Sequence, residues 1–117
     1  MKNEHKLLAS ILILYLICAK VIAGNGSGKV EIEHVGGYGN GSTVFFYTTN
    51  HSNKPTCNTH RERWVLDLNS LVGKEQYSLL LSAQMAEKEV IVGGSGDCGL
   101  FFNSETASWV GYPVTHP

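Results

Sequence analysis

Apolar and polar side chains alternate over residues 30–34 with a period of two residues. This period is typical of a half-buried β-strand. Residues 43–49 are rich in β-branched and aromatic side chains, and the glycine-rich stretch 36–41 before them permits a tight reversal of the chain. The pattern therefore predicts a β-hairpin, preceded at 24–28 by a flexible glycine-rich leader.

Three more β-segments and one helix follow the hairpin. The strands are expected at 63–68, 89–92 and 109–114. Residues 70–88 contain strong helix formers, and the Ser70 hydroxyl can accept from the free amides of the first turn. The predicted order is β-β-β-α-β-β, which is that of an OB-type barrel. The expected fold class is mainly β (α+β), a small five-stranded antiparallel OB-like barrel with one helix between strands 3 and 4.

The predicted helix is apolar on two faces. The face expected to pack on the core comprises Val72, Leu79, Leu80, Ala83 and Ala86. The other face carries Tyr77, Leu81 and Met85, where a solitary surface helix would show charges. Single exposed apolar residues are ordinary in folded proteins. The alternative that we favour is a homo-oligomer interface, because small secreted domains supplement a thin core by oligomerising.

The first 23 residues have the features of a secretory signal peptide. Two lysines precede an apolar run at 7–19, and Ala23 offers a small residue for cleavage before Gly24. The run is shorter than the roughly 20 apolar residues that span a bilayer, which disfavours a membrane anchor. Removing residues 1–23 from the 117-residue chain leaves 94 residues, enough for a single OB-like domain at 24–117.

The expected location is therefore secreted or periplasmic, in a bacterium, with no membrane span after the signal is removed. The part of the chain after residue 23 has six Lys and Arg residues against nine Asp and Glu residues, a net charge of −3. Nucleic-acid binding requires clustered positive charges that displace counterions. Nucleic acid is therefore not expected as a partner.

Cys57 and Cys98 are the only cysteines after residue 23, and an even number in a secreted chain favours a disulfide bond. A metal site would need further ligands, and the histidines show no paired spacing. A catalytic cysteine beside His60 is a second alternative. We expect the Cys57–Cys98 disulfide and no bound metal.

A glycine motif at 94–99 matches the pattern G-x-G-x-x-G. The dinucleotide-binding fingerprint requires a helix directly after this pattern, whereas residues 100–103 are expected to be extended or coiled. The motif is therefore interpreted as a turn leading into the disulfide, and no cofactor is expected.

No arrangement of residues predicts catalysis, and a small hydrolase using His60 with Asp97 is the weakest of the functions considered. Aromatic and amide side chains instead gather near the predicted loops. A flat ring together with directional hydrogen bonds suits sugars and other polar ligands. The candidate ligand-binding residues are Tyr47, His51, Asn53, Asn58, Trp109 and Tyr112. The alternative is that Tyr47 and Trp109 are ordinary core residues.

Several segments of the chain carry a resemblance to known proteins: Cys57, 63–68, 73–74, 77–83, 90–94 and Cys98. They resemble a group of small secreted or periplasmic bacterial proteins and, more distantly, the B subunits of subtilase-cytotoxin and typhoid-toxin type toxins. The resemblance implies an OB barrel assembled as a ring of five, with helices lining a central channel and glycan recognition on the outer surface. No binding residue of that family is transferred to this chain.

Two functions follow from these observations. The leading one is a secreted, non-enzymatic binding module, resembling a toxin B subunit, that forms a homo-oligomer and recognises a cell-surface glycan or carries a secreted catalytic subunit. The alternative is a periplasmic inhibitor or structural partner protein that docks on another protein through the glycine-rich stretches 36–41 or 93–99.

Overall fold

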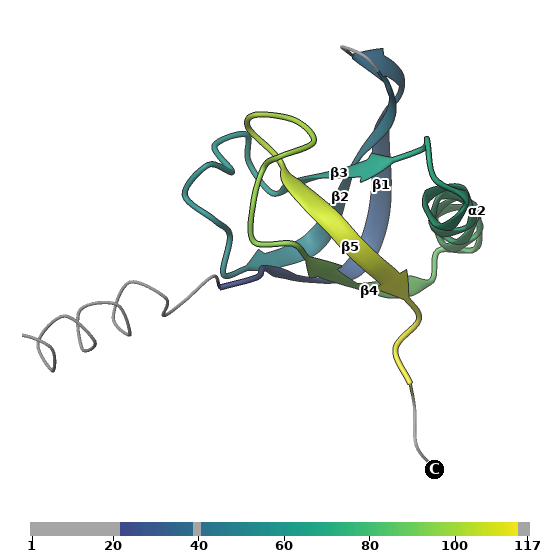
Figure 1. The fold of residues 1–117 in the computed structure, drawn as a ribbon. Coiled ribbons are helices and arrows are strands. Elements are labelled where there is room, and N and C mark those ends of the chain that lie inside the picture. The colour runs from purple at the N-terminus through teal and green to yellow at the C-terminus, as the bar shows by residue number, and fades with distance from the viewer. Residues whose placement is uncertain (1–21, 39–40, 115–117) are drawn as a thin grey trace, which may run out of the picture.

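Five β-strands close into a barrel in the computed structural model of the protein, and one helix is inserted between the third and fourth strands (Figure 1). The structure describes residues 22–38 and 41–114, so nearly all of the predicted signal peptide lies outside the described residues. The elements are β1 (Asn25–Tyr38), β2 (Gly41–Ser52), β3 (Arg63–Asp67), α2 (Leu71–Ala86), β4 (Glu89–Gly94) and β5 (Glu105–Gly111). The predicted order β-β-β-α-β-β and the small OB-like barrel are confirmed.

The barrel is closed by a parallel pair of strands. Neighbouring strands follow the order β1-β2-β3-β5-β4, and β4 returns to β1. Four pairings are antiparallel, as expected, but the barrel is not antiparallel throughout: β3 and β5 run parallel, with Trp64 opposite Glu105. The reason is geometric, because strand directions cannot alternate all the way around a closed ring with an odd number of strands. The parallel pair places the first residues of β5 beside β3.

The prediction of a flexible leader at 24–28 is wrong. Residues 25–29 pair with β4 on one side, and residues 25–27 also pair with β2 on the other. A segment with a partner on each side has its backbone amides and carbonyls held in hydrogen bonds. Gly28 has a φ of 109°, where the register between β1 and β2 shifts. The glycine therefore permits a β-bulge within a strand rather than a mobile segment.

Helix α2 has a defined cap at each end. The Ser70 Oγ accepts the Gly73 N–H at 2.9 Å, as the sequence predicts, and Glu87 ends the helix with a left-handed φ of 55°. A Cβ atom at Gly73 would lie 1.7 Å from the carbonyl oxygen of Asp67. The helix therefore starts directly against the end of β3, which fixes its position on the barrel.

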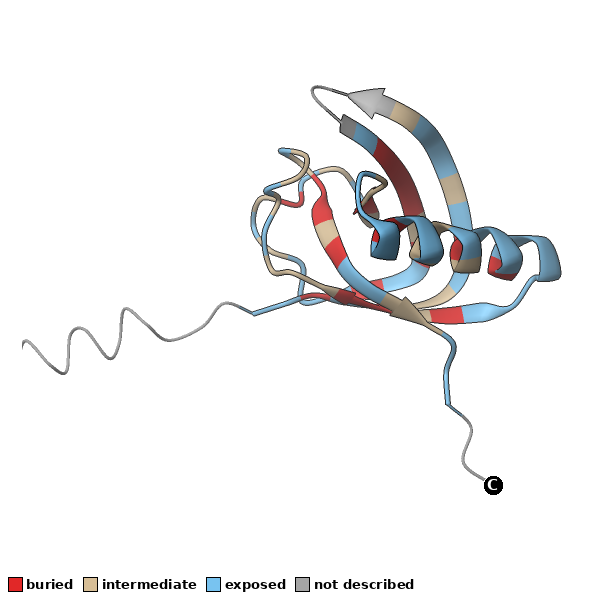
Figure 2. Ribbon diagram, turned by 45° about the vertical axis from the view of Figure 1, so that its right-hand side comes forward, coloured by how far each residue is buried: buried red, intermediate tan, exposed pale blue. Residues whose placement is uncertain are grey.

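Apolar side chains from all five strands fill the barrel, and α2 covers one end of it (Figures 1 and 2). The buried cluster comprises Val30, Val44, Phe46, Trp64, Leu66, Leu80, Ala83, Val90, Val92 and Ala107. Leu79 is partly buried beside the helix residues of this cluster, as expected. Val72 and Ala86, also predicted to face inward, are exposed, because α2 meets the barrel along the narrow line of its buried residues.

The predicted disulfide is confirmed and joins the β2–β3 loop to the β4–β5 loop, with 6.1 Å between the Cα atoms of Cys57 and Cys98. It links two long loops that lie side by side on one flank of the barrel (Figure 1).

We expect the double variant Cys57→Ser and Cys98→Ser to lose about 4 kcal/mol of unfolding free energy, because the 41-residue separation sets the loop entropy released on unfolding. Urea unfolding followed by tryptophan fluorescence measures this loss. Reduced wild-type protein is the control and should unfold at the same urea concentration as the variant. A loss below about 1 kcal/mol would contradict the expectation that the bridge is a main source of stability.

Candidate functional site

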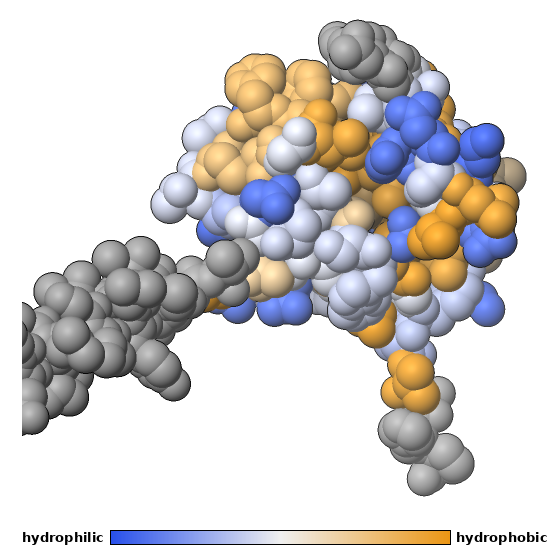
Figure 3. Space-filling view, viewed as in Figure 1, coloured by the Kyte–Doolittle hydropathy of each residue, from blue (hydrophilic) through white to orange (hydrophobic). Residues whose placement is uncertain are grey.

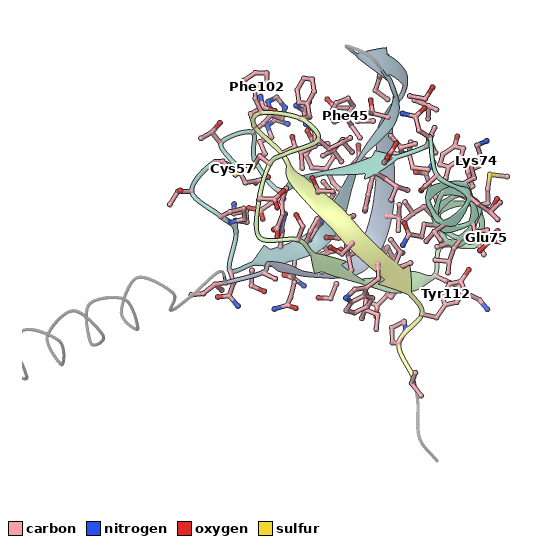
Figure 4. The ribbon with its side chains drawn as sticks, viewed as in Figure 1. Phe45, Cys57, Lys74, Glu75, Phe102 and Tyr112 are labelled. Carbon is pink, nitrogen blue, oxygen red and sulfur yellow. A yellow bond between two sulfur atoms is a disulfide. The ribbon has the colours of Figure 1, made fainter. Side chains whose placement is uncertain are left out.

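A hollow of about 350 Å³ opens on the barrel surface beside the β4–β5 loop. Its lining residues come from β1, β2, the first residue of β3 and the two disulfide-linked loops: Glu33, His34, Phe45, His60, Arg63, Phe101, Phe102 and Asn103. We call it the Phe102 hollow. Figure 4 shows Phe45 and Phe102 near each other on one side of the molecule, with Lys74 and Glu75 of α2 on another.

Phe45 forms the floor of the Phe102 hollow. Val44 and Phe46 on either side of it belong to the buried cluster, so the alternation along β2 directs Phe45 out of the barrel. It is nevertheless only 2% exposed. Phe101 packs edge-on against it with ring centroids 4.9 Å apart, and the Arg63 guanidinium lies 4.4 Å from its ring centroid. An outward aromatic ring is thus held rigidly beneath the hollow.

Arg63 is held in one orientation on the wall of the hollow. Its Nε donates to Ser104 Oγ and its Nη2 donates to Asn103 Oδ1, both at 2.8 Å. Its Nη1 makes a longer contact of 3.4 Å with Glu33 Oε2. The rigid fork of a guanidinium fixed at two points is preorganised for further polar contacts. The wall therefore combines a positioned cation with a neighbouring carboxylate.

Phe102 lies at the rim of the hollow and is 75% exposed. Its ring tilts against Phe101 at 5.0 Å between centroids. Figure 3 shows apolar surface gathered on the same flank, over the β4–β5 loop. The hollow thus has an aromatic floor, an aromatic rim and polar walls.

Tyr47 lies two residues beyond Phe45 on β2 and interacts with Glu33. Burial, followed by the negative charge of Glu33, raises the pKa of Tyr47 above its usual value of 10.0, while the nearby Arg63 acts in the opposite direction. Its phenol therefore stays protonated as a hydrogen-bond donor throughout the neutral range. Tyr47 does not line the Phe102 hollow: it lines a separate surface hollow with residues 29–31 and 48–49, and its link to the Phe102 hollow is the shared neighbour Glu33.

The structure does not gather the six candidate ligand residues in one place. Asn53 is exposed in the β2–β3 loop, with a left-handed φ of 54°. Trp109 and Tyr112 are exposed at the far end of β5. The Trp109 ring covers Gly93 of β4, where a Cβ atom would lie 1.9 Å from its Nε1. Trp109 and Tyr112 thus belong to a surface separate from the Phe102 hollow.

His51 and Asn58 are buried beside Glu105, His51 at its carboxylate and Asn58 at its backbone. The His51 Nε2 lies 2.7 Å from Glu105 Oε1, and both side chains are fully buried. Asn58 Oδ1 accepts the backbone N–H of Glu105 at 2.7 Å. The other carboxylate oxygen, Oε2, accepts the N–H groups of Gly24 at 2.8 Å and Gly96 at 2.9 Å. We call Gly24, His51, Asn58, Gly96 and Glu105 the Glu105 cluster. Its hydrogen bonds are made between parts of the chain itself.

The ring of His51 is fixed from two further directions. It stacks on Trp64 with centroids 3.6 Å apart and planes 11° from parallel. Its Nδ1 lies 3.0 Å from the carbonyl oxygen of Glu62, which can only accept, so Nδ1 carries a proton. A second proton lies between His51 Nε2 and the Glu105 carboxylate, because two lone pairs could not approach to 2.7 Å.

Sequence reasoning missed both the aromatic hollow and the inward direction of Glu105. The signal for the hollow was the adjacent pair Phe101 and Phe102 in a segment with no regular period. The signal for Glu105 was its even spacing from Ala107, which is buried on the same strand. This alternation of buried positions already starts at Glu105, so the fifth strand begins there rather than at the predicted residue 109.

His60 and Asp97, the residues of the hydrolase alternative, are not brought together in the hollow. His60 lines it, whereas Asp97 does not, and the Asp97 Oδ1 accepts the Gly99 N–H at 3.0 Å. Within residues 22–38 and 41–114, no three His, Cys, Asp or Glu side chains are placed to hold a metal ion. Over the same described part of the chain, no helix has the length and apolar character needed to cross a membrane.

No family model, curated protein or solved structure matches the chain. The resemblance to toxin B subunits therefore stays a prediction from the residues that carry it.

We expect Glu105→Gln to lower the free energy of unfolding by about 3–5 kcal/mol, because it leaves the buried His51 without its anionic partner. Urea unfolding at pH 7 measures the change. Glu62→Gln is the matched control: it removes the charge from the partly exposed Lys54–Glu62 pair and should cost at most about 1 kcal/mol. Equal midpoints for the two variants would show that the buried charge does not stabilise the fold.

Proposed function

We propose that this protein is a secreted, non-enzymatic binding module that recognises a glycan in the Phe102 hollow. The observation that carries the proposal is the exposed Phe102 ring above a floor of packed aromatic side chains. A sugar ring has an apolar C–H face that stacks on such rings, and hydroxyl groups that need directional partners. The hollow offers both kinds of contact.

The polar walls of the hollow suit hydroxyl groups. Arg63 supplies donors held at fixed positions, and Glu33 supplies an acceptor that is partly exposed. Asn103 already accepts from Arg63 through its Oδ1, so its amide N–H groups are what it offers to a ligand. Because these side chains are ordered before binding, little conformational entropy is lost when a ligand is held.

The same proposal includes self-assembly through α2. Two residues of the predicted second stripe carry exposed apolar surface on α2: Leu81 is exposed and Met85 is 84% exposed. Tyr77, the third residue of that stripe, packs partly against the core and contributes less outward surface. A second copy that covered Leu81 and Met85 would remove this apolar surface from water. A ring of five, as the resemblance implies, is one such assembly.

One observation favours the alternative function, a protein that docks on another protein through its glycine-rich loops. The β1–β2 hairpin projects beyond the barrel (Figure 2). Val35 on the projecting part is exposed although it is apolar. A projecting hairpin that exposes an apolar side chain can pair with a partner's surface or sheet edge, which would suit an inhibitor or structural partner in the periplasm.

We expect Phe102→Ala to weaken glycan binding at least about tenfold without changing the melting temperature, because the ring is exposed at the rim of the hollow. Binding on a glycan array, followed by calorimetry with any glycan found, measures this. Leu71→Ala is the matched control, since Leu71 is 74% exposed on α2, away from the hollow. A wild-type protein that binds no glycan on the array, or an undiminished affinity of Phe102→Ala, would rule the proposal out.

We also expect the mature protein to be an oligomer that Met85→Lys dissociates, because a buried lysine at the helix interface would be unpaired. Light scattering on size-exclusion chromatography measures the mass. Phe102→Lys is the control, since it introduces the same charge on the side of the molecule away from α2 (Figure 4). A wild-type mass of one protomer would return Leu81 and Met85 to the free surface and bring the docking alternative to the front.

A further inference from the structure

The backbone nitrogen of Gly24 points into the Glu105 cluster. It donates to Glu105 Oε2 at 2.8 Å, and both groups are buried. The carbonyl oxygen of Gly24 accepts the Gly94 N–H at 2.8 Å. The residues just before it, Ile22 and Ala23, are exposed. Burial therefore begins at this one peptide bond, where the chain enters the barrel.

The position of Gly24 admits no side chain. A Cβ atom there would lie 2.0 Å from Glu105 Oε1 and 3.0 Å from His51 Nε2. Neither neighbour can move away easily, because Glu105 accepts further hydrogen bonds and His51 is stacked on Trp64. The cluster is thus shaped around a backbone nitrogen at this point.

The bond between Ala23 and Gly24 is also the one at which the sequence predicts signal-peptide cleavage. A signal peptidase hydrolyses this bond with one water molecule. The bond breaks to leave a carboxylate on Ala23 and an amine on Gly24, which takes up a proton to become an ammonium group. Since the nitrogen is buried in the folded barrel, cleavage has to precede the docking of Gly24.

We propose that the mature N-terminus at Gly24 is a structural cation, and that signal-peptide removal converts the Gly24–Glu105 hydrogen bond into a buried ion pair. The uncleaved chain offers Glu105 a single neutral N–H from Gly24. The ammonium group offers a full positive charge and three donors, so that the hydrogen bond to the carboxylate gains the attraction between two opposite charges at short distance. Maturation and the stability of the barrel are thereby coupled.

Two titratable groups face the Gly24 nitrogen, namely Glu105 from β5 and His51 from β2. Strand β4 contributes only the backbone of Gly94, which binds the Gly24 carbonyl. The two carboxylate oxygens are divided between the two nitrogen atoms, with Oε1 toward His51 Nε2 and Oε2 toward the Gly24 nitrogen. The Gly24 nitrogen therefore does not compete with His51 for the same oxygen.

The test compares three mature chains: one that begins with the free amine of Gly24, the same chain acetylated at Gly24, and one that begins at Ala23. The free-amine chain should have an unfolding equilibrium constant about tenfold lower than the other two at pH 6. A folded-state pKa raised by Glu105 gives stability that is present below the unfolded amine value of about 8 and is lost as pH rises through the folded value. The advantage should therefore vanish at high pH.

Equal stability of the free-amine and acetylated chains from pH 5 to pH 10 would overturn the proposal. Because Glu105→Gln is expected to weaken the fold, the role of the carboxylate is tested in the wild-type protein by ¹⁵N NMR titration of labelled Gly24. An amine pKa above about 8 supports the ion pair, and one at or below that value refutes it. The intact mass of the full chain after export is the last measurement, and cleavage at any bond other than Ala23–Gly24 would also refute the proposal.

Discussion

The carboxylate of Glu105 is the constraint on which much of the structure depends. It has no exposed surface, and its oxygens hold three separate parts of the chain: His51 at the end of β2, Gly24 before β1, and Gly96 in the β4–β5 loop. A buried charge without such partners would cost several kcal/mol. Strand β5 therefore starts where these groups converge, and β1, β2 and β5 meet in a fixed arrangement.

This anchor also determines the shape of the outer surface. Ser104, next to Glu105 in the chain, is fully buried and accepts from the Arg63 guanidinium, which lies over Phe45. The disulfide at Cys98 holds the other end of the same loop. With both ends fixed, the loop has little freedom to carry Phe101 and Phe102 away from the barrel. The interior polar cluster thus supports the hollow on the outside.

The order of elements was predictable because it depends on local patterns. The alternation at 30–34 and the cap at Ser70 each depend only on residues that are neighbours in the sequence. The hairpin and the helix predicted from them are present in the structure. The candidate site was less predictable, because the fate of a polar residue depends on distant partners. His51 and Asn58 are polar residues, yet both are buried, because each forms a hydrogen bond with Glu105, which lies more than 45 residues further along the chain. The glycines at 24–28 suggested mobility for the same reason, since their strand partners are far away in sequence.

The Glu105 cluster and the exposed Phe102 ring both depart from the usual division of a protein into an apolar interior and a polar surface. At the Glu105 cluster, a carboxylate, an imidazole and an amide lie inside, and hydrogen bonds from the chain itself offset the cost. At Phe102, a large aromatic ring lies outside, and its contact with Phe101 covers only part of it. The stability of the fold accounts for the buried polar groups of the Glu105 cluster. It does not account for the exposed Phe102 ring, because an exposed aromatic ring adds little to folding. Binding to another molecule is the process that would bury this ring.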